Sequence, residues 1–446
     1  MSNNASLADY RTALTAPGAG VPVLCSLLAR LPIAMIGFSV LLYTQHVTGT
    51  FAIAGLVGAG LLLGVAAGSV VQGRIIDRFG PTWPILLATV IFTAAVISLV
   101  LSIERGAPTA LLVALAVMSG SSQPGVPSAA RSLWARLLPP GNARDAAYAY
   151  EAISMEVFFI LGPGLAGIML LTPWPGSGVV AGAACMAIGS VGFALTPAAR
   201  AWRARPKGEH AGSVMGALSS AGMRTVVIAV LGFGIVIGFV EVAVPAVATD
   251  AGEPTIGGLL LSVWSLSSVL FGLFFSLRPW PRPLPLRLPV LLGGHGVLVG
   301  MLVLPTAFAP TSLLLLAGCM VIAGALITPQ ATSHSTAIDV VAPQGTATEA
   351  FGWVITAATL GLAIGHSTSG FVVERFGPPM SFLAAACAGL ALAALVWARR
   401  HTMRTSTPPV EVVELRADTG LGSSPELGVD VGVDELDDLP RAGVRS

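Results

Sequence analysis

Apolar runs separated by short polar segments occupy almost the whole chain. Each run, at about 20 residues, is long enough to cross the hydrocarbon core of a bilayer as a helix. A bilayer core offers backbone N–H and C=O groups no partner, so spanning segments of this kind are expected to be helices. Twelve runs can be placed, near residues 22–44, 50–72, 83–103, 107–128, 146–171, 177–197, 225–248, 255–276, 288–306, 311–330, 347–371 and 379–398.

The polar segments between the runs differ in positive charge. Counted from a cytoplasmic N-terminus, four of the five cytoplasmic segments between runs carry at least two cations, whereas the opposite segments carry only Arg105 and Arg375. Lys and Arg are enriched in the cytoplasmic loops of membrane proteins. Both termini are therefore predicted to be cytoplasmic, in a multi-pass protein of the cytoplasmic membrane.

The longest internal polar segment divides the runs into two groups of six that resemble each other. Arg74 and Arg78 recur 204 residues later as Arg278 and Arg282, and glycines of the fifth run recur at nearly the same offset in the eleventh. Parallel six-helix repeats are an architecture of secondary transporters. The sequence thus predicts an N-terminal bundle over 1–198, an inter-domain loop over 199–223, a C-terminal bundle over 224–400 and a tail over 401–446.

The tail differs in composition from the rest of the chain. Residues 405–446 hold nine acids and three arginines, with no aromatic residue. Such a segment cannot bury a core, so we expect it to be a disordered acidic tail. It is interpreted as solvated, with partner binding as the alternative.

The composition excludes several classes of protein. AVILMFWYC residues make up 54% of the chain and charged residues 10%, against about a quarter charged in soluble domains, and the mean hydropathy is +0.83. A net charge of +1 gives no reason to expect nucleic-acid binding. The cysteines form no CxxC pair and the histidines have no metal-ligand spacing, so no metal or other cofactor is predicted. No HExxH, Walker or serine-elbow sequence is present, so the chain is not interpreted as an enzyme.

The segment between the second and third runs carries a recognisable pattern, Gly73-Arg-Ile-Ile-Asp77-Arg78-Phe-Gly80-Pro81. Glycine permits a tight turn, and a carboxylate such as Asp77 can pair with basic groups or with a helix N-terminus. The segment resembles the signature loop of the major facilitator superfamily, roughly Gly-x-Leu-Ala-Asp-Arg-x-Gly-Arg-Lys, without the final basic pair. The resemblance implies an all-α fold of twelve spans and a conformational latch at Gly73, Asp77, Arg78 and Gly80.

The fifth run carries a second, partial resemblance. Gly162-Pro163-Gly164-Leu-Ala-Gly167 is similar to the end of a motif typical of proton-coupled efflux members of the superfamily. Proline kinks a helix, and small residues let another helix approach. The alternative is a packing face without bearing on export. The arginine that efflux members often carry in the fourth helix is absent from this chain.

Glycines at four-residue spacing mark two further helices. The second run carries Gly60, Gly64 and Gly68, and the eleventh carries Gly361 and Gly365. Small residues at this spacing allow close helix contact. The resemblance implies that these two helices face each other across the interface between the bundles.

Ionisable groups inside membrane spans are costly, and this makes them functional candidates. Arg30 lies in the first run, and Glu151 and Glu156 lie in the fifth, which starts from the same side. A five-residue spacing puts these carboxylates about 140° apart on a helix, so we expect Arg30 to pair with only one of them. Glu156 is favoured as the proton-exchanging carboxylate, because burial favours the protonated form. The alternative is a static ion pair that braces the bundle.

Other candidates lie on helices that line the central cavity in the resembled family. Glu241 in the seventh run is a candidate outer gate, substrate contact or proton site, with a water-accessible rim carboxylate as the alternative. Gln123 and Pro124 in the fourth run, with Gln330 and His334 in the tenth, are candidate substrate contacts.

The whole pattern indicates a secondary transporter that moves a small molecule by alternating access. Proton-coupled efflux of a neutral or amphipathic metabolite or drug is favoured, because the inferred cavity is apolar with few charges. A sugar or metabolite importer or facilitator without proton coupling is the alternative, and a non-transporting scaffold or receptor is a weaker one. The expected partners are a small-molecule substrate, protons and the lipid bilayer. The protein is expected to act as a monomer, without a cofactor or nucleic acid.

Overall fold

The computed structural model describes residues 7–139, 141–202, 216–276, 283–309, 311–343 and 347–403, and every regular element within them is helical. Twelve segments are long and apolar enough to cross a membrane, so the predicted all-α fold with twelve spans is confirmed. Parts of the predicted inter-domain loop and tail, 203–215 and 404–446, lie outside the described residues. So do Arg278 and Arg282 of the predicted repeat.

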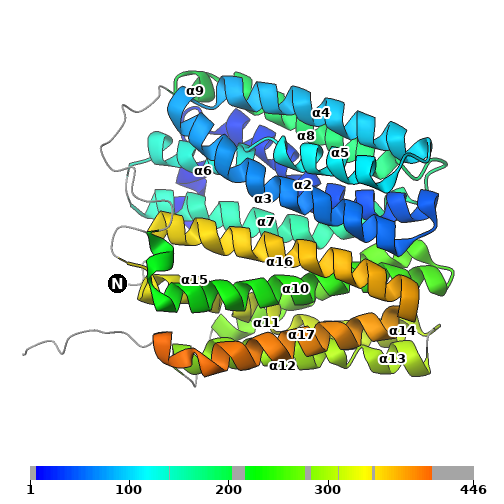
Figure 1. Ribbon diagram of the computed structural model, residues 1–446. Helices are drawn as coiled ribbons and strands as arrows, with labels where there is room; N and C mark the ends of the chain where they lie inside the picture. The colour runs from blue at the N-terminus through cyan, green and yellow to red at the C-terminus, as the bar shows by residue number, and fades with distance from the viewer. Residues whose placement is uncertain are drawn as a thin grey trace, which may run out of the picture. The chain divides into compact units, whose positions relative to one another are not determined.

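The helices follow the order of the predicted runs, with the two halves of the chain in the upper and lower parts of Figure 1. The first half holds α1 (Leu7–Leu14), α2 (Gly20–Thr48), α3 (Phe51–Phe79), α4 (Thr82–Glu104), α5 (Thr109–Ser121), α6 (Val126–Leu137), α7 (Asn142–Met169), α8 (Ser177–Leu195) and α9 (Pro197–Arg200). The second half holds η1 (Ala217–Ser219), α10 (Ala221–Asp250), α11 (Pro254–Ser276), α12 (Leu284–Gly300), α13 (Val303–Phe308), α14 (Leu313–Gly324), α15 (Ile327–Val341), α16 (Ala347–Phe376), α17 (Pro378–Ala398) and η2 (Arg400–Met403).

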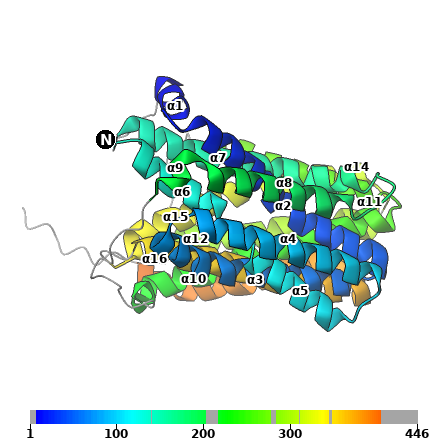
Figure 2. The same ribbon diagram turned by 90° about the horizontal axis from the view of Figure 1, so that it is seen from above.

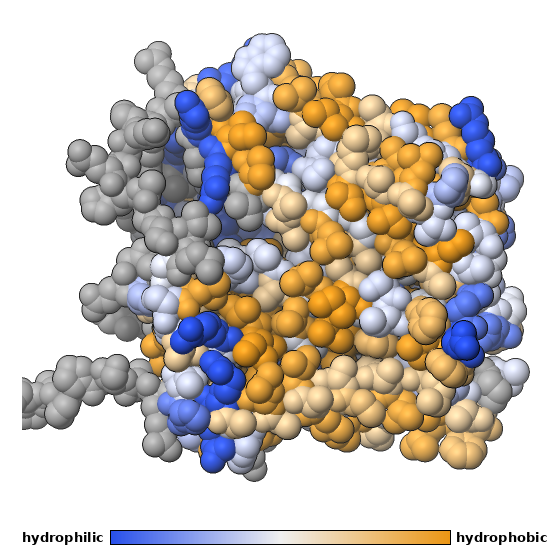
Figure 3. Space-filling model, viewed as in Figure 1, coloured by the Kyte–Doolittle hydropathy of each residue, from blue (hydrophilic) through white to orange (hydrophobic). Residues whose placement is uncertain are grey.

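Large apolar side chains are exposed along the outside of the helices. Leu314 is 86% exposed, Phe308 84% and Trp83 78%. Figure 3 shows apolar residues across the middle of one face, with hydrophilic residues toward its two ends. An extended apolar surface of this kind is stable in lipid and not in water, which agrees with twelve membrane spans.

The segment that resembles the signature loop is helical over most of its length. Gly73, Asp77 and Arg78 lie in the last turns of α3, so the turn expected at Gly73 is wrong. Gly80 makes the turn with a φ of 80°, which glycine adopts without steric cost. Arg78 lies over the Phe79 ring, and the side chain of Asp77 lies outside the described residues.

The fourth predicted span is broken into α5 and α6 by residues 122–125, which include Gln123 and Pro124. A break inside a bilayer frees backbone groups that must find partners within the protein. Gln72 on α3 provides them. Its Nε2 donates to the carbonyls of Ser121 and Gln123 at 3.0 and 2.8 Å, and its Oε1 accepts from the Gly125 N–H at 3.0 Å.

The tenth span is broken in the same way, between α14 and α15 at residues 325–326. Here the partner is Ser268 on α11, whose Oγ accepts from the Thr328 N–H at 3.1 Å and bonds to Thr328 Oγ1 at 2.7 Å. Both halves therefore interrupt their fourth span and stabilise the break from a neighbouring helix.

The Gln72→Leu substitution is expected to destabilise the protein by about 3 kcal/mol, because three backbone groups at the break lose their partner. Thermal unfolding of the purified protein measures this effect. Gln45→Leu is the matched control, since the described structure shows no hydrogen bond to that side chain near the end of α2. Equal unfolding temperatures of the two variants would mean that the break is stabilised by other groups.

The two halves pack together toward the outer side, defined as the side opposite the Arg-rich segments. One hydrophobic cluster joins Phe38, Phe51 and Ala166 of the first half to Val240 and Trp264 of the second. Toward the inner side, each cluster in the described part of the chain holds residues of one half only. The described helices thus form an arrangement closed on the outer side, with the spans running side by side (Figures 1 and 2).

A hydrogen bond across the halves adds to the outer closure. Glu374, near the end of α16, accepts through Oε2 from the Phe51 N–H at 3.1 Å. Phe51 is the first residue of α3, and a carboxylate is favourable at a helix N-terminus.

Candidate functional site

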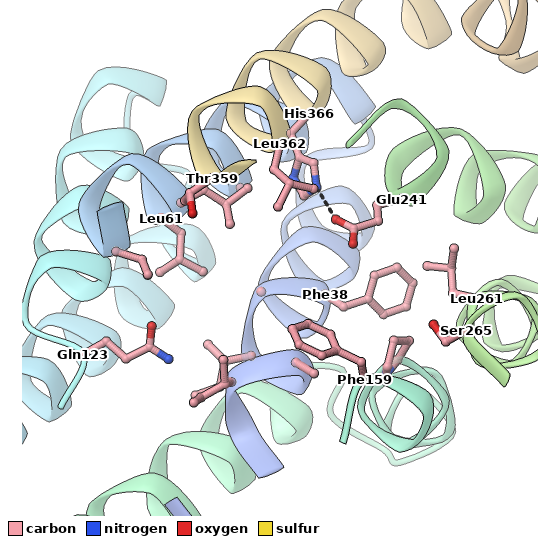
Figure 4. A pocket seen from close by; sticks show the side chains of 18 of the residues that line it. Phe38, Leu61, Gln123, Phe159, Glu241, Leu261, Ser265, Thr359, Leu362 and His366 are labelled. Atoms are coloured by element: carbon pink, nitrogen blue, oxygen red, sulfur yellow. Dashed lines mark hydrogen bonds and ion pairs between the residues drawn. The ribbon is translucent and has the colours of Figure 1, made fainter. Parts of the chain in front are cut away.

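A cavity of about 250 Å³ lies between the halves, lined by residues of both. Its walls are mostly apolar, and its polar side chains include those of Gln123, Glu241, Ser265, Thr359 and His366 (Figure 4). A single water needs only about 10–15 Å³, so the space can hold several waters or a small organic molecule. Gln123 lines the cavity as predicted, whereas Pro124 lies at the break between α5 and α6.

Glu241 on α10 and His366 on α16 point toward one another in the cavity wall (Figure 4). Glu241 Oε2 and His366 Nε2 lie 2.7 Å apart. The His366 side chain is 7% exposed and that of Glu241 is 34% exposed. The pair therefore has one deeply buried member and one that reaches the open space.

Glycine contacts between α10 and α16 bring this pair together. A Cβ atom on Gly365 would lie 2.4 Å from the Ile235 carbonyl oxygen, and one on Gly361 would lie 2.3 Å from the Leu231 carbonyl oxygen. Only glycine permits such close backbone approach. Gly361 and Gly365 thus pack α16 against α10 within the second half, one turn from Glu241 and His366.

The other nitrogen of His366 faces the first half. A Cβ atom on Gly58 of α3 would lie 2.8 Å from His366 Nδ1, and one on Gly55 would lie 2.4 Å from the His366 carbonyl oxygen. His366 Nδ1 has no hydrogen-bond partner in the described structure. His366 therefore touches both the Glu241 carboxylate and the contact between the two halves.

The glycine run of α3 has a different partner from the one expected. Cβ atoms on Gly60, Gly64 and Gly68 would meet backbone atoms of the fourth span, for example the Val117 carbonyl at 2.2 Å from Gly64. The helices α3 and α16 do lie side by side, but Gly55, Gly58 and Gly370 make that contact. The two helices thus face each other as expected, but through these glycines, whereas Gly60, Gly64 and Gly68 pack against the fourth span.

The glycine-rich motif of α7 makes the second close contact between the halves. A Cβ atom on Gly258 of α11 would lie 2.2 Å from the Pro163 carbonyl oxygen, and one on Gly167 would lie 2.6 Å from the Thr255 carbonyl oxygen. Gly162 faces the first span instead, where its Cβ would lie 2.7 Å from Ala34 Cβ. Pro163 also lines the cavity, so the motif lies where the halves meet.

Arg30 pairs with Glu151, one of the two carboxylates proposed for it. Both are buried, at 1% and 7% exposure. Trp134 Nε1 donates to Glu151 Oε1 at 2.8 Å, and Arg30 Nη1 donates to Ser154 Oγ at 3.0 Å. The cluster ties α2, α6 and α7 together inside the first half.

Glu156 lies apart from this cluster. Its side chain is exposed, and the described structure shows no hydrogen bond or ion pair to it. Seven residues separate it from Pro163, so the two share a face of α7. Glu156 therefore lies on the cavity-facing side of α7, nearer the inner side than the cavity itself.

Gln330 and His334 do not line this cavity, and their predicted contact with substrate stays a prediction. Both are buried within the second half, at 0% and 3% exposure. The residue that the sequence pattern missed is His366. Its signal was a histidine inside a span, directly after Gly365 of the glycine pair.

Comparisons with known proteins agree with this arrangement. The sequence profile described as Major Facilitator Superfamily matches residues 23–365, and no curated protein matches the chain. The chain is similar to the structure of the nucleoside transporter NupG, with 16% identity and a TM-score of 0.67 over 85% of this chain and 99% of that one. It is also similar to a bacterial homolog of the human lysosomal transporter Spinster, inward-facing and unoccupied, with 16% identity and a TM-score of 0.67 over 86% and 97%. The peptide transporter POT in complex with sulfate gives 14% identity and a TM-score of 0.64 over 89% and 99%. These structural similarities show that the chain shares the fold of these transporters.

Proposed function

The chain belongs to the major facilitator superfamily, and from this premise we propose that it couples the movement of a small molecule to protons at the Glu241–His366 pair. It is a multi-pass secondary transporter and not an enzyme. The observation that carries the proposal is the double contact of His366, which bonds to Glu241 in the cavity wall and abuts Gly58 of the other half.

Protonation of this pair acts on the contact between the halves. Histidine is the side chain whose charge changes most readily near neutral pH. A proton on His366 Nδ1 points at the glycine contact on α3, where it finds no acceptor in the described structure. A buried donor without an acceptor is unfavourable, so protonation weakens the outer closure. The outward-open state therefore takes up the proton, and the inward-open state releases it.

The cavity favours an uncharged or amphipathic substrate. Its lining is mainly apolar and includes Glu241 but no Lys or Arg, so a strongly anionic molecule finds no partner there. We assign export as the direction, on the partial efflux motif of α7, whose Pro163 and Gly167 lie at the contact between the halves. Import or facilitated diffusion of a sugar or metabolite is the alternative.

Transport by proteoliposomes with an imposed pH gradient and a lumenal pH dye tests the proposal. A mixed panel of drugs, sugars, nucleosides and peptides supplies the substrates. The wild type should collapse the gradient with particular compounds, whereas Glu241→Gln should abolish this response. Glu156→Gln is the matched carboxylate control and should retain the response. If Glu241→Gln still collapses the gradient as the wild type does, coupling at this pair is contradicted. If only Glu156→Gln loses the response, the coupling residue is Glu156.

A further inference from the structure

Two histidines and a tryptophan gather beside Phe233 inside the second half, and Gln330 lies about one helical turn before one of these histidines. Trp264 comes from α11, His295 from α12, and Gln330 and His334 from α15, and all are at least nine-tenths buried. The Phe233 ring centroid lies 5.9 Å from that of His295 and 5.5 Å from that of His334, and Trp264 stacks on His295 at 6.4 Å.

Several polar atoms of this group lack hydrogen-bond partners in the described structure. They include both amide atoms of Gln330, Nε2 of His334 and Nε1 of Trp264. Buried polar atoms in native proteins are almost always bonded to the protein, to water or to a ligand. So many unpartnered atoms around one aromatic ring indicate a place built to receive another polar molecule.

The break in the tenth span lies beside this group. Gln330 is in the first turn of α15, just after the break, and a Cβ atom on Gly324 at the end of α14 would lie 3.1 Å from Trp264 Cδ1. In the first half, Gln72 forms hydrogen bonds to the backbone groups freed at the equivalent break. In the second half, Ser268 binds the backbone, and Gln330 is left unpartnered. Broken helices mark substrate sites in transporters.

Trp264 connects the group to the central cavity, because it also lines that cavity. Its Nε1 has no hydrogen-bond partner in the described structure, so Trp264 belongs both to the cavity lining and to the unpartnered group. Trp264 is therefore the side chain through which a molecule in the cavity would reach this group.

We propose that Trp264, His295, Gln330 and His334 bind an uncharged hydrogen-bonding group of the transported molecule, such as an amide, a hydroxyl or a ring nitrogen. This inference rests on the proposed function and names its substrate class. Gln330 offers both a donor and an acceptor, Trp264 offers a donor, and Phe233 offers a ring for stacking. None of the four side chains is a carboxylate, an ammonium or a guanidinium, so a charged group has no counter-ion among them.

Calorimetric titration of the purified protein tests the site, with aromatic amides, nucleosides and sugars as uncharged probes and tetraphenylphosphonium as the cationic probe. At least one uncharged probe should bind the wild type. Gln330→Leu and Trp264→Phe should each weaken its Kd at least tenfold. Trp264→Phe keeps an aromatic ring at this position and removes the indole donor, so it tests the site where Gln330→Leu fails to fold. Gln45→Leu is the matched control and should bind as the wild type does.

Two results would overturn the site: no uncharged probe binds the wild type, or probes bind the variants unchanged. A failure of proton coupling is distinguishable, because calorimetry measures probe binding without a pH gradient, whereas coupling is measured only by the pH response of the proteoliposomes. If tetraphenylphosphonium binds the wild type and Gln330→Leu weakens its Kd to the same extent, the inference that the site takes an uncharged group would also be overturned.

Discussion

Arg30→Met should lower the free energy of unfolding by about 3–5 kcal/mol, the usual cost of leaving a buried charge unpaired. Glu151 is 7% exposed, and without the guanidinium its carboxylate keeps only the Trp134 indole as a hydrogen-bond donor in the described structure. Thermal or denaturant unfolding in detergent measures the change. This is the largest stability effect that we expect from a single side chain in the first half.

The double variant Arg30→Met/Glu151→Leu is the control that separates bracing from proton exchange. Removing both charges deletes the unpaired group, so most of the lost stability should return. If the single variant is as stable as the wild type, the ion pair does not brace the bundle. A double variant that regains stability but loses pH-dependent transport would assign proton coupling to this cluster.

Gly258→Val should lower the transport rate about 10- to 100-fold, because the outer side can no longer close. A Cβ atom at this position would lie 2.2 Å from the Pro163 carbonyl oxygen of the other half. Overpacking of this kind costs about 1–3 kcal/mol, and each 1.4 kcal/mol is a factor of ten in an equilibrium. The altered balance should favour states that are open to the outside.

Cysteine labelling measures this shift directly. With the four native cysteines replaced by alanine, a Thr359→Cys reporter in the cavity should react faster with an impermeant thiol reagent from the outside in Gly258→Val. Gly318→Val is the matched control, since a Cβ atom on Gly318 has nothing within 4 Å. Equal labelling of both variants would show that this contact does not set the outer closure.

The spans and their order could be predicted because a bilayer requires apolar helices of fixed length, a property that each segment carries in its own residues. The pairing of Arg30 with one carboxylate followed from helical spacing, and the choice of Glu151 depended on Trp134 and Ser154 beside it. Such neighbours come from packing between helices, which spacing within one helix does not specify.

The glycine runs show the same limit of local patterns. Spacing at Gly60, Gly64 and Gly68 correctly indicates that a backbone approaches, but not which helix supplies it. His366 was missed for a related reason. Its role arises from Glu241, 125 residues away, and from Gly58 of the other half.

The break at residues 122–125 has a mechanical consequence. The outer piece of the fourth span, α5, is fixed to α3 by glycine contacts, whereas Trp134 fixes the inner piece, α6, to Glu151 and Arg30. Gln72 of α3 bonds to backbone groups on both sides of the break, so both pieces are also fixed to α3. A rocking motion of the first half therefore carries both pieces of this span together with α3, and the bend in the span is kept.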